Sequence, residues 1–139
     1  MQKRKVLPVV SILLTIVLIF GVFAVQAEGA KKPKKRIVKS YVRLIIATGR
    51  KTLNYRVPIK KKYTVYTVLR TASKKHRFSL NAKRYSFGVF VEKIAGVKNN
   101  PQAGRYWLYY VNKKLANVGA SLRKVKKGDR IKWVYSKTD

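Results

Sequence analysis

The spacing of apolar residues constrains this chain most, because its period changes twice between residues 41 and 136. Apolar and polar residues first alternate, as in half-buried strands, then recur at helical spacing, and then alternate again. The predicted strands are 41–47, 52–59, 85–94, 106–111 and 131–135. The predicted helix places Val65, Val68, Leu69 and Ala72 on one side. Strands on both sides of a single helix predict an α+β fold.

Local signals refine this prediction. The segment 48–51 predicts the turn of a hairpin, and Pro58 marks the end or an edge position of the second strand. Thr64 can cap a helix of about three turns, and residues 74–77 place positive charge at its C-terminal end. A hairpin, a helix and further strands in a small mixed sheet predict a β-grasp-like single domain over residues 41–136.

The supply of reactive side chains excludes most enzyme classes. The chain has 34 Lys and Arg, four Asp and Glu, one His and no Cys, which gives a net charge of +30. Cysteine chemistry is excluded, and a carboxylate pair would need both Glu92 and Asp129. Metal sites need several ligands close together, and His76 is the only histidine. We predict no catalytic and no metal site, and interpret Glu92 as an ion-pair partner, Asp129 as a turn residue and His76 as a surface residue.

The N-terminal 27 residues have the pattern of a targeting segment. A basic start is followed by the apolar run 6–25, which predicts a helix long enough to span a bilayer, and by a small-residue site ending at Ala27. The segment is either a cleaved signal peptide or a retained membrane anchor, and both place the domain outside the cytoplasm. The basic residues that follow the run favour the opposite topology under the positive-inside rule.

Residues 28–40 form a predicted basic linker. It contains the candidate polyanion-contact residues Lys31, Lys32, Lys34, Lys35 and Arg36. The linker is interpreted as a solvated spacer, with contact to anionic lipid as the alternative. The excess of positive charge over the whole chain points to polyanions such as nucleic acid or an anionic cell-wall polymer.

Five segments between residues 63 and 135 carry a family resemblance. They are Tyr63–Leu69, Phe90–Val97, Tyr106–Asn112, Val118–Ala120 and Lys127–Tyr135. In this order they resemble a bacterial domain family of unknown function that is similar to the C-terminal domain of transcobalamin and intrinsic factor. The resemblance covers nearly all of 41–135, and its most specific parts are the aromatic strand and the final Gly-Asp segment.

The resemblance implies a β-grasp-like fold and, in bacteria, an exported or surface protein. In the animal cobalamin carriers this domain closes over a corrinoid held by a larger helical domain. Only a linker precedes Tyr41 here, so the resemblance implies a separate helical partner protein if a corrinoid is bound. Asn112 is followed by Lys113, where the family usually has Gly, so this turn is expected to adopt another geometry.

The aromatic strand supplies the main ligand candidates. Trp107 and Tyr109 share one face, which is interpreted as core, although both could stack on a flat ligand. Tyr106 and Tyr110 share the other face, which is the better ligand candidate. Gly96, through close backbone approach, and Asn112 complete the set of candidate ligand-binding residues.

The residues and the resemblance together predict an exported or membrane-tethered, non-catalytic binding or adhesion module. Its ligand is a small molecule of corrinoid type, and no other cofactor is predicted. The alternative function is charge-driven binding of a polyanion, either nucleic acid or an anionic cell-wall polymer.

Overall fold

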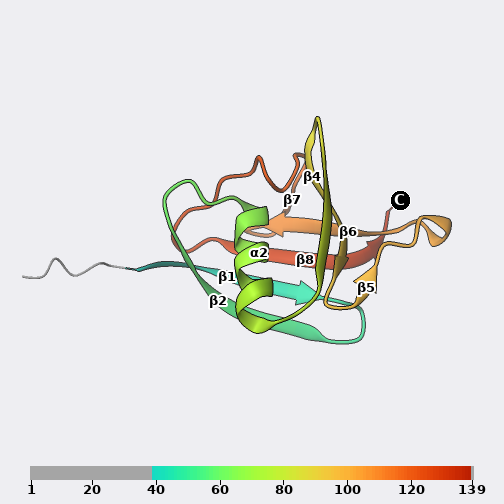
Figure 1. Ribbon diagram of the computed structural model, residues 1–139, viewed down its shortest axis with the longest axis horizontal. Helices are drawn as coiled ribbons and strands as arrows, with labels where there is room; N and C mark the ends of the chain where they lie inside the picture. The colour runs from blue at the N-terminus through green and yellow to red at the C-terminus, as the bar shows by residue number, and fades with distance from the viewer. Residues whose placement is uncertain (1–38, 139) are drawn as a thin grey trace, which may run out of the picture. The chain divides into compact units, whose positions relative to one another are not determined.

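The computed structural model describes residues 39–138, and Figure 1 shows how their elements are arranged. In chain order these are β1 (Ser40–Ala47), β2 (Thr52–Ile59), α2 (Val65–His76), β3 (Leu80–Tyr85), β4 (Gly88–Ile94), β5 (Val97–Lys98), the 3-10 helix η2 (Pro101–Ala103), β6 (Arg105–Val111), β7 (Lys114–Leu115) and β8 (Arg130–Lys137). One sheet has the strand order β2-β1-β8-β6-β7, and a second has the order β3-β4-β5. The predicted α+β class is confirmed.

The larger sheet is mixed. β1 and β2 pair antiparallel along their whole length, which confirms the predicted hairpin. β8 returns parallel to β1 on its other side and pairs antiparallel with β6. β2 is an edge strand, a position that tolerates the missing N–H of Pro58. The core face of β1 consists of Val42, Leu44 and Ile46, all buried as their alternation predicts.

Helix α2 packs on one face of this sheet and buries the four predicted residues. The Thr64 hydroxyl accepts a hydrogen bond from the Thr67 N–H at 3.3 Å, which confirms the predicted cap. Two further N–H groups of the first turn donate hydrogen bonds to the segment that precedes β8. Val65 donates to the Arg123 carbonyl and Tyr66 to the Ala120 carbonyl, each at 2.9 Å. The start of the helix therefore also fixes residues 120–123 in place.

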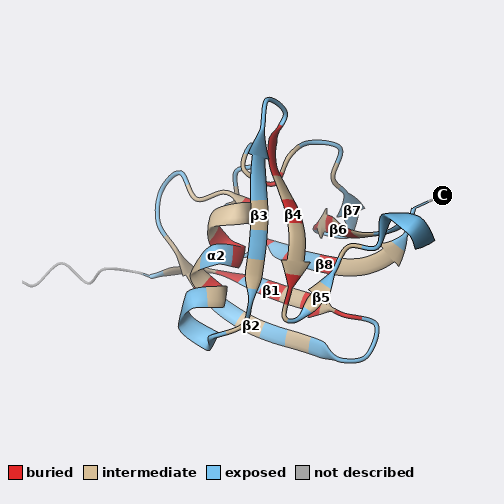
Figure 2. Cartoon of the chain, turned by 45° about the vertical axis from the view of Figure 1, so that its right-hand side comes forward, coloured by how far each residue is buried: buried red, intermediate tan, exposed pale blue. Residues whose placement is uncertain are grey.

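The prediction of one strand over 85–94 is wrong. Leu80–Tyr85 and Gly88–Ile94 form two antiparallel strands, and the turn at 86–87 joins them. β3 was missed because only Leu80 and Ala82 on one of its faces are partly buried and residues 83–85 are exposed, so the alternation in the sequence is short. Gly88 has a φ of +113°, a conformation that favours glycine and lets the chain reverse at this point. The tip of this hairpin projects past the larger sheet (Figures 1 and 2).

The predicted small mixed sheet is present, but the later strands divide between it and a second, three-stranded sheet that was not predicted. The segment 95–104, expected to be a loop, contains β5 and the 3-10 helix. Asn99 joins the sheets: its side chain donates to the Val91 carbonyl at 3.0 Å and accepts from the Trp107 N–H at 2.9 Å. The Trp107 indole also donates to the Val97 carbonyl at 2.9 Å. The two sheets and α2 enclose one core, coloured red in Figure 2.

The predicted targeting segment 1–27 and most of the predicted linker lie outside the described residues. Within residues 39–138, no helix is long and apolar enough to cross a membrane.

Candidate functional site

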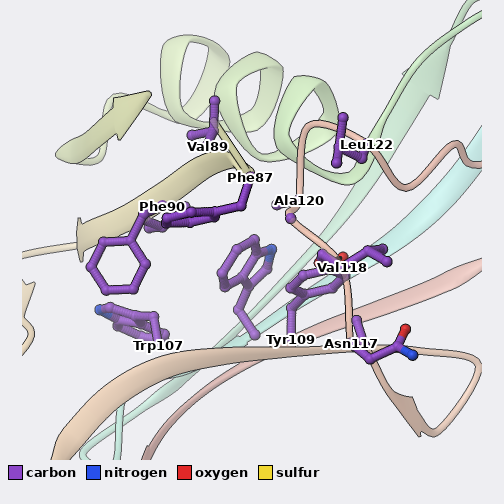
Figure 3. Close-up of a pocket in the computed structure, with 13 residues that line it drawn as sticks. Phe87, Val89, Phe90, Trp107, Tyr109, Asn117, Val118, Ala120 and Leu122 are labelled. Atoms are coloured by element: carbon purple, nitrogen blue, oxygen red, sulfur yellow. Dashed lines mark hydrogen bonds between the residues drawn. The ribbon is translucent and has the colours of Figure 1, made fainter. Parts of the chain in front are cut away.

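An aromatic pocket of about 560 Å³ lies between the start of β4, the strand β6 and the segment 116–122. Figure 3 shows Phe87 and Phe90 on one side, Trp107 and Tyr109 opposite them, and Val118, Ala120 and Leu122 along a third side. The lining residues come from four separate segments of the chain: 87–91, 107–109, 116–122 and Trp133. The pocket is therefore a product of tertiary packing.

The floor of the pocket is rigid and aromatic. Trp107 and Tyr109 rise from β6, and Trp133 comes from the neighbouring strand β8. The ring centroids of Tyr109 and Trp133 lie 5.1 Å apart, a distance typical of favourable aromatic pairs. All three side chains are buried. Since the chain has only two tryptophans, both of them lie in the lining of this pocket.

The rim is apolar and exposed. Phe87, Val118 and Leu122 are 58%, 44% and 60% exposed, although side chains of this size are usually packed. Tyr85 stacks on Phe87 with a centroid separation of 5.1 Å, which holds the tip of the β3–β4 hairpin in one arrangement. Three of the five large apolar residues that are exposed among the described residues therefore line one hollow, a grouping that marks interaction sites.

Close backbone contacts join the start of β4 to the segment 119–121, which form two sides of the pocket. A Cβ added to Gly119 would lie 2.5 Å from the Phe87 carbonyl oxygen, so only glycine fits at this position. The Ser121 hydroxyl accepts a hydrogen bond from the Val89 N–H at 3.0 Å. The Tyr109 hydroxyl donates to the Val118 carbonyl at 2.6 Å. These contacts set the width of the pocket.

Two polar groups of the floor have unusual environments. Burial raises the pKa of the Tyr109 hydroxyl above its ordinary value, and the positive charge of Arg123 opposes this shift in part. The indole Nε1 of Trp133 is buried and has no hydrogen-bond acceptor among the described residues. A buried donor without an acceptor is costly, so this N–H is a group that a bound molecule could satisfy.

The predicted ligand residues fall on opposite sides of the larger sheet. Trp107 and Tyr109 face the core, as interpreted, and they also form the pocket floor. Tyr106 and Tyr110, on the face predicted to be the better ligand surface, lie away from this pocket. Tyr106 packs edge-on against Phe90, a wall residue of this pocket, with centroids 6.5 Å apart, but does not line the pocket itself. Tyr110 lines a separate hollow. The structure thus brings together one half of the predicted aromatic set and separates the other half from it.

The other two ligand candidates occupy turns. Gly96 has a φ of +88° in the turn between β4 and β5, and its N–H donates to the Ser79 hydroxyl at 2.8 Å. Asn112 and Lys113 have φ values of 52° and 71° in the turn between β6 and β7. The expectation of another geometry at this turn is therefore wrong, because Lys113 adopts the left-handed conformation that Gly would favour.

Asn112 and Asp129 form a small polar network. The Asn112 side chain donates to the Asp129 carboxylate at 3.0 Å and accepts from the Arg130 N–H at 2.9 Å. The same carboxylate accepts from the Lys126 N–H at 2.9 Å, which confirms that Asp129 belongs to a tight turn. The turn leads into β8 rather than closing a hairpin. Both side chains hold the ends of β6 and β8 together.

The remaining predictions concern charged residues. Glu92 forms an ion pair with Lys83, with 3.3 Å between Nζ and Oε1, as predicted. His76 is exposed in the last turn of α2, and its ring stacks on Tyr55 with centroids 4.1 Å apart. Residues 39–138 contain no group of three or more side chains suited to hold a metal ion. The candidate linker residues Lys31, Lys32, Lys34, Lys35 and Arg36 lie outside the described residues.

Sequence reasoning missed the rim of the pocket. Phe87 was placed in a strand, whereas it lies in the turn of the β3–β4 hairpin. Leu122 and Val118 were assigned to a short connector. The available signal was the occurrence of apolar side chains beside glycines, at 87–88 in the predicted strand and at 118–119 in the predicted connector.

Comparison with known families identifies the domain. Residues 63–137, from the start of α2 to the end of β8, match the family described as "Domain of unknown function (DUF4430)". The chain belongs to this family. The match covers the whole aromatic pocket of the DUF4430 domain and leaves out the β1–β2 hairpin. No curated protein matches the chain.

Solved structures support the fold of the DUF4430 domain. Haptocorrin in complex with Cbi is similar, with a TM-score of 0.64 and 20% identity over 73% of this chain and 26% of haptocorrin. A candidate metal-binding protein from Ruminococcus gnavus ATCC 29149 is also similar, with a TM-score of 0.56 and 10% identity over 73% of this chain and all of that chain. At these identities the likeness is one of fold. It supports the predicted relation to the transcobalamin C-terminal domain.

Proposed function

We propose that this chain is an exported or membrane-tethered, non-catalytic binding module, and that its ligand lies in the aromatic pocket. The observation that carries the proposal is the combination of an exposed apolar rim with a rigid aromatic floor. Binding sites for small molecules are concave and mostly apolar, with a few polar groups that orient the ligand. The buried indole N–H of Trp133 is such a group here.

A flat, largely apolar ligand fits this lining. Aromatic side chains face each other across the hollow, as Figure 3 shows for Phe87 and Phe90 opposite Trp107 and Tyr109. The strand order β2-β1-β8-β6, with β8 parallel to β1, supports the β-grasp-like description. The fold likeness to haptocorrin, whose structure contains Cbi, makes a corrinoid the first ligand to test.

The tryptophans offer a direct assay. We expect Cbi, added to the purified full-length chain in detergent, to change the tryptophan fluorescence in a saturable manner, because both tryptophans line the pocket. Phe87→Ala should weaken binding by roughly tenfold, since the rim would lose a large apolar contact. Leu115→Ala is the matched control, because Leu115 is a similarly exposed apolar residue outside this pocket. Equal affinities of the two variants would contradict the placement of the site.

Export is tested separately. The proposal expects a reporter fused after Asp139 to be active only when it functions outside the cytoplasm, because residues 1–27 have the pattern of a signal or anchor segment. A reporter that is active only in the cytoplasm would overturn this part of the proposal. It would leave the ligand site to be judged by the fluorescence titration.

A further inference from the structure

The face of the larger sheet opposite α2 is open and basic. Along β1 the buried residues alternate with Arg43, which is exposed, and along β8 they alternate with Arg130 and Lys132, also exposed. Arg56 of the edge strand β2 is exposed as well. Since partners in a sheet register point to the same face, these four cationic side chains lie on one surface.

Three of these cations are direct neighbours. Arg43 is in register with Arg56 on one side and with Arg130 on the other. Neighbouring strands lie about 5 Å apart, so these three arginine side chains leave the sheet side by side, in one row across β2, β1 and β8. Like charges that face each other across strands destabilise a sheet. An anion that binds between them would remove this repulsion.

No carboxylate of the described residues offsets the charge of this row. The acidic residues in this part of the chain are Glu92 and Asp129. Glu92 pairs with Lys83 in the other sheet. Asp129 is buried, and its carboxylate accepts from Asn112 and from the Lys126 N–H.

One arginine of the row is already positioned. The guanidinium of Arg56 lies over the ring of Tyr41, with 4.2 Å from Cζ to the ring centroid. Such a cation–π contact lowers the freedom of the side chain, so less entropy is lost when an anion binds to it. Arginine also presents paired N–H groups that match the oxygens of phosphate and carboxylate.

One end of the row, at Arg130, borders a hollow of about 680 Å³ on the same face. Its floor is formed by the small and aliphatic residues Ile45, Ala47 and Val134. Cationic, hydroxyl and amide groups surround this floor, and Tyr110 is its single aromatic residue. The polar lining residues are Thr52, Asn54, Lys113, Arg130 and Lys132.

We propose that this face binds a linear, non-aromatic polyanion, with oxyanion groups on a sugar or polyol backbone. The arginine row and Lys132 would hold successive anionic groups, and the Thr52 hydroxyl and the Asn54 amide would bind backbone hydroxyls. Single-stranded nucleic acid fits less well, because its binding sites use several aromatic side chains as stacking surfaces. Here Tyr110 is half-buried, and Arg56 already covers one face of Tyr41.

The test uses the full-length chain in detergent with three probes: poly(glycerol phosphate), polygalacturonate and oligo(dT). Affinities are measured by calorimetry at a low and a moderate salt concentration. Arg43→Gln/Arg130→Gln should weaken binding of the preferred non-aromatic polymer by about tenfold or more and flatten its salt dependence. The matched control is Arg70→Gln/Arg84→Gln, which removes equal charge from exposed positions on α2 and β3. The control should bind nearly as well as the wild type.

Each outcome decides the proposal. Selective binding of poly(glycerol phosphate) or of polygalacturonate supports it and shows whether the anion is phosphate or carboxylate. Absence of binding, oligo(dT) binding that is as tight as either polymer, or equal losses in the two double variants would overturn it. The Arg43→Gln/Arg130→Gln variant should melt at or above the wild-type temperature without polymer, because it relieves a like-charge pair. Lost binding in that variant would then not be due to unfolding.

Discussion

The two tryptophans provide a matched pair of substitutions that tests how the pocket floor is built. Trp107 and Trp133 lie on adjacent strands, and both are almost fully buried, with 5% and 2% of their surface exposed. Replacing either by Phe removes the same atoms, so the loss of apolar burial is similar in the two variants. The hydrogen bonds of the two indole groups differ. Trp107 Nε1 donates to the Val97 carbonyl at 2.9 Å, whereas Trp133 Nε1 has no acceptor among the described residues.

This difference gives an expected magnitude. Trp107→Phe loses a hydrogen bond worth about 1 kcal/mol, while Trp133→Phe removes an unsatisfied donor whose burial costs about 1–3 kcal/mol. We therefore expect Trp107→Phe to lower the free energy of unfolding by about 2–4 kcal/mol more than Trp133→Phe does. For a domain of this size the difference corresponds to roughly 10 °C or more in melting temperature.

The assay is urea unfolding of both variants, followed by far-ultraviolet circular dichroism because the fluorescent residues are altered. The slope of the free energy of unfolding against urea should stay the same in both variants, which shows that the comparison concerns the folded state. Equal losses, or a larger loss for Trp133→Phe, would show that the Trp133 indole is satisfied in solution. This N–H would then not be available to a ligand.

The remaining predictions concern the pocket wall. Gly119→Ala should lower the free energy of unfolding by about 1–3 kcal/mol and shift the tryptophan emission, because its Cβ would contact the Phe87 carbonyl at 2.5 Å. Gly96→Ala, with a φ of +88° and no atom within 4 Å, should be strained by a similar energy but leave the emission unchanged. Tyr109→Phe should cost about 1 kcal/mol through its lost bond to the Val118 carbonyl. Burial raises the pKa of Tyr109, so its hydroxyl contributes to stability below pH 10 and this contribution declines as the pH rises above 10. The difference in the free energy of unfolding between wild type and Tyr109→Phe should therefore become smaller above pH 10.

The parts of the fold that local patterns determine were predictable. Strand β1 and helix α2 each bury a regular set of apolar side chains, and the Thr64 cap follows from the hydrogen-bonding needs of a helix start. β3 was not predictable, because only two of its side chains, Leu80 and Ala82, are partly buried, and so short an alternation does not identify a strand. The turn at 112–113 was misjudged because packing of the flanking strands overrides the preference of a single lysine.

The candidate site was predictable in part, because local patterns determine the position of only some of its residues. The alternation in β6 places Trp107 and Tyr109 on the core side, but the rim residues reach them only through tertiary packing. Phe87 and Leu122 are brought together by the Gly88–Gly119 contact, which no periodicity reports. The arginine row likewise depends on strand register, since Arg43 and Arg130 are distant in sequence and meet only through parallel pairing.

Alternation along the strands also separates the two proposed sites. On β8, Trp133 faces the pocket, and the preceding residue, Lys132, faces the open surface, so neighbouring residues serve opposite sides of one sheet. The core side of this sheet is closely packed and therefore resists small displacements. Occupation of one face should therefore leave the affinity of the other nearly unchanged. Polymer binding that persists in Trp133→Phe, together with Cbi binding that persists in Arg43→Gln/Arg130→Gln, would establish two independent sites, whereas mutual loss would indicate a single coupled one.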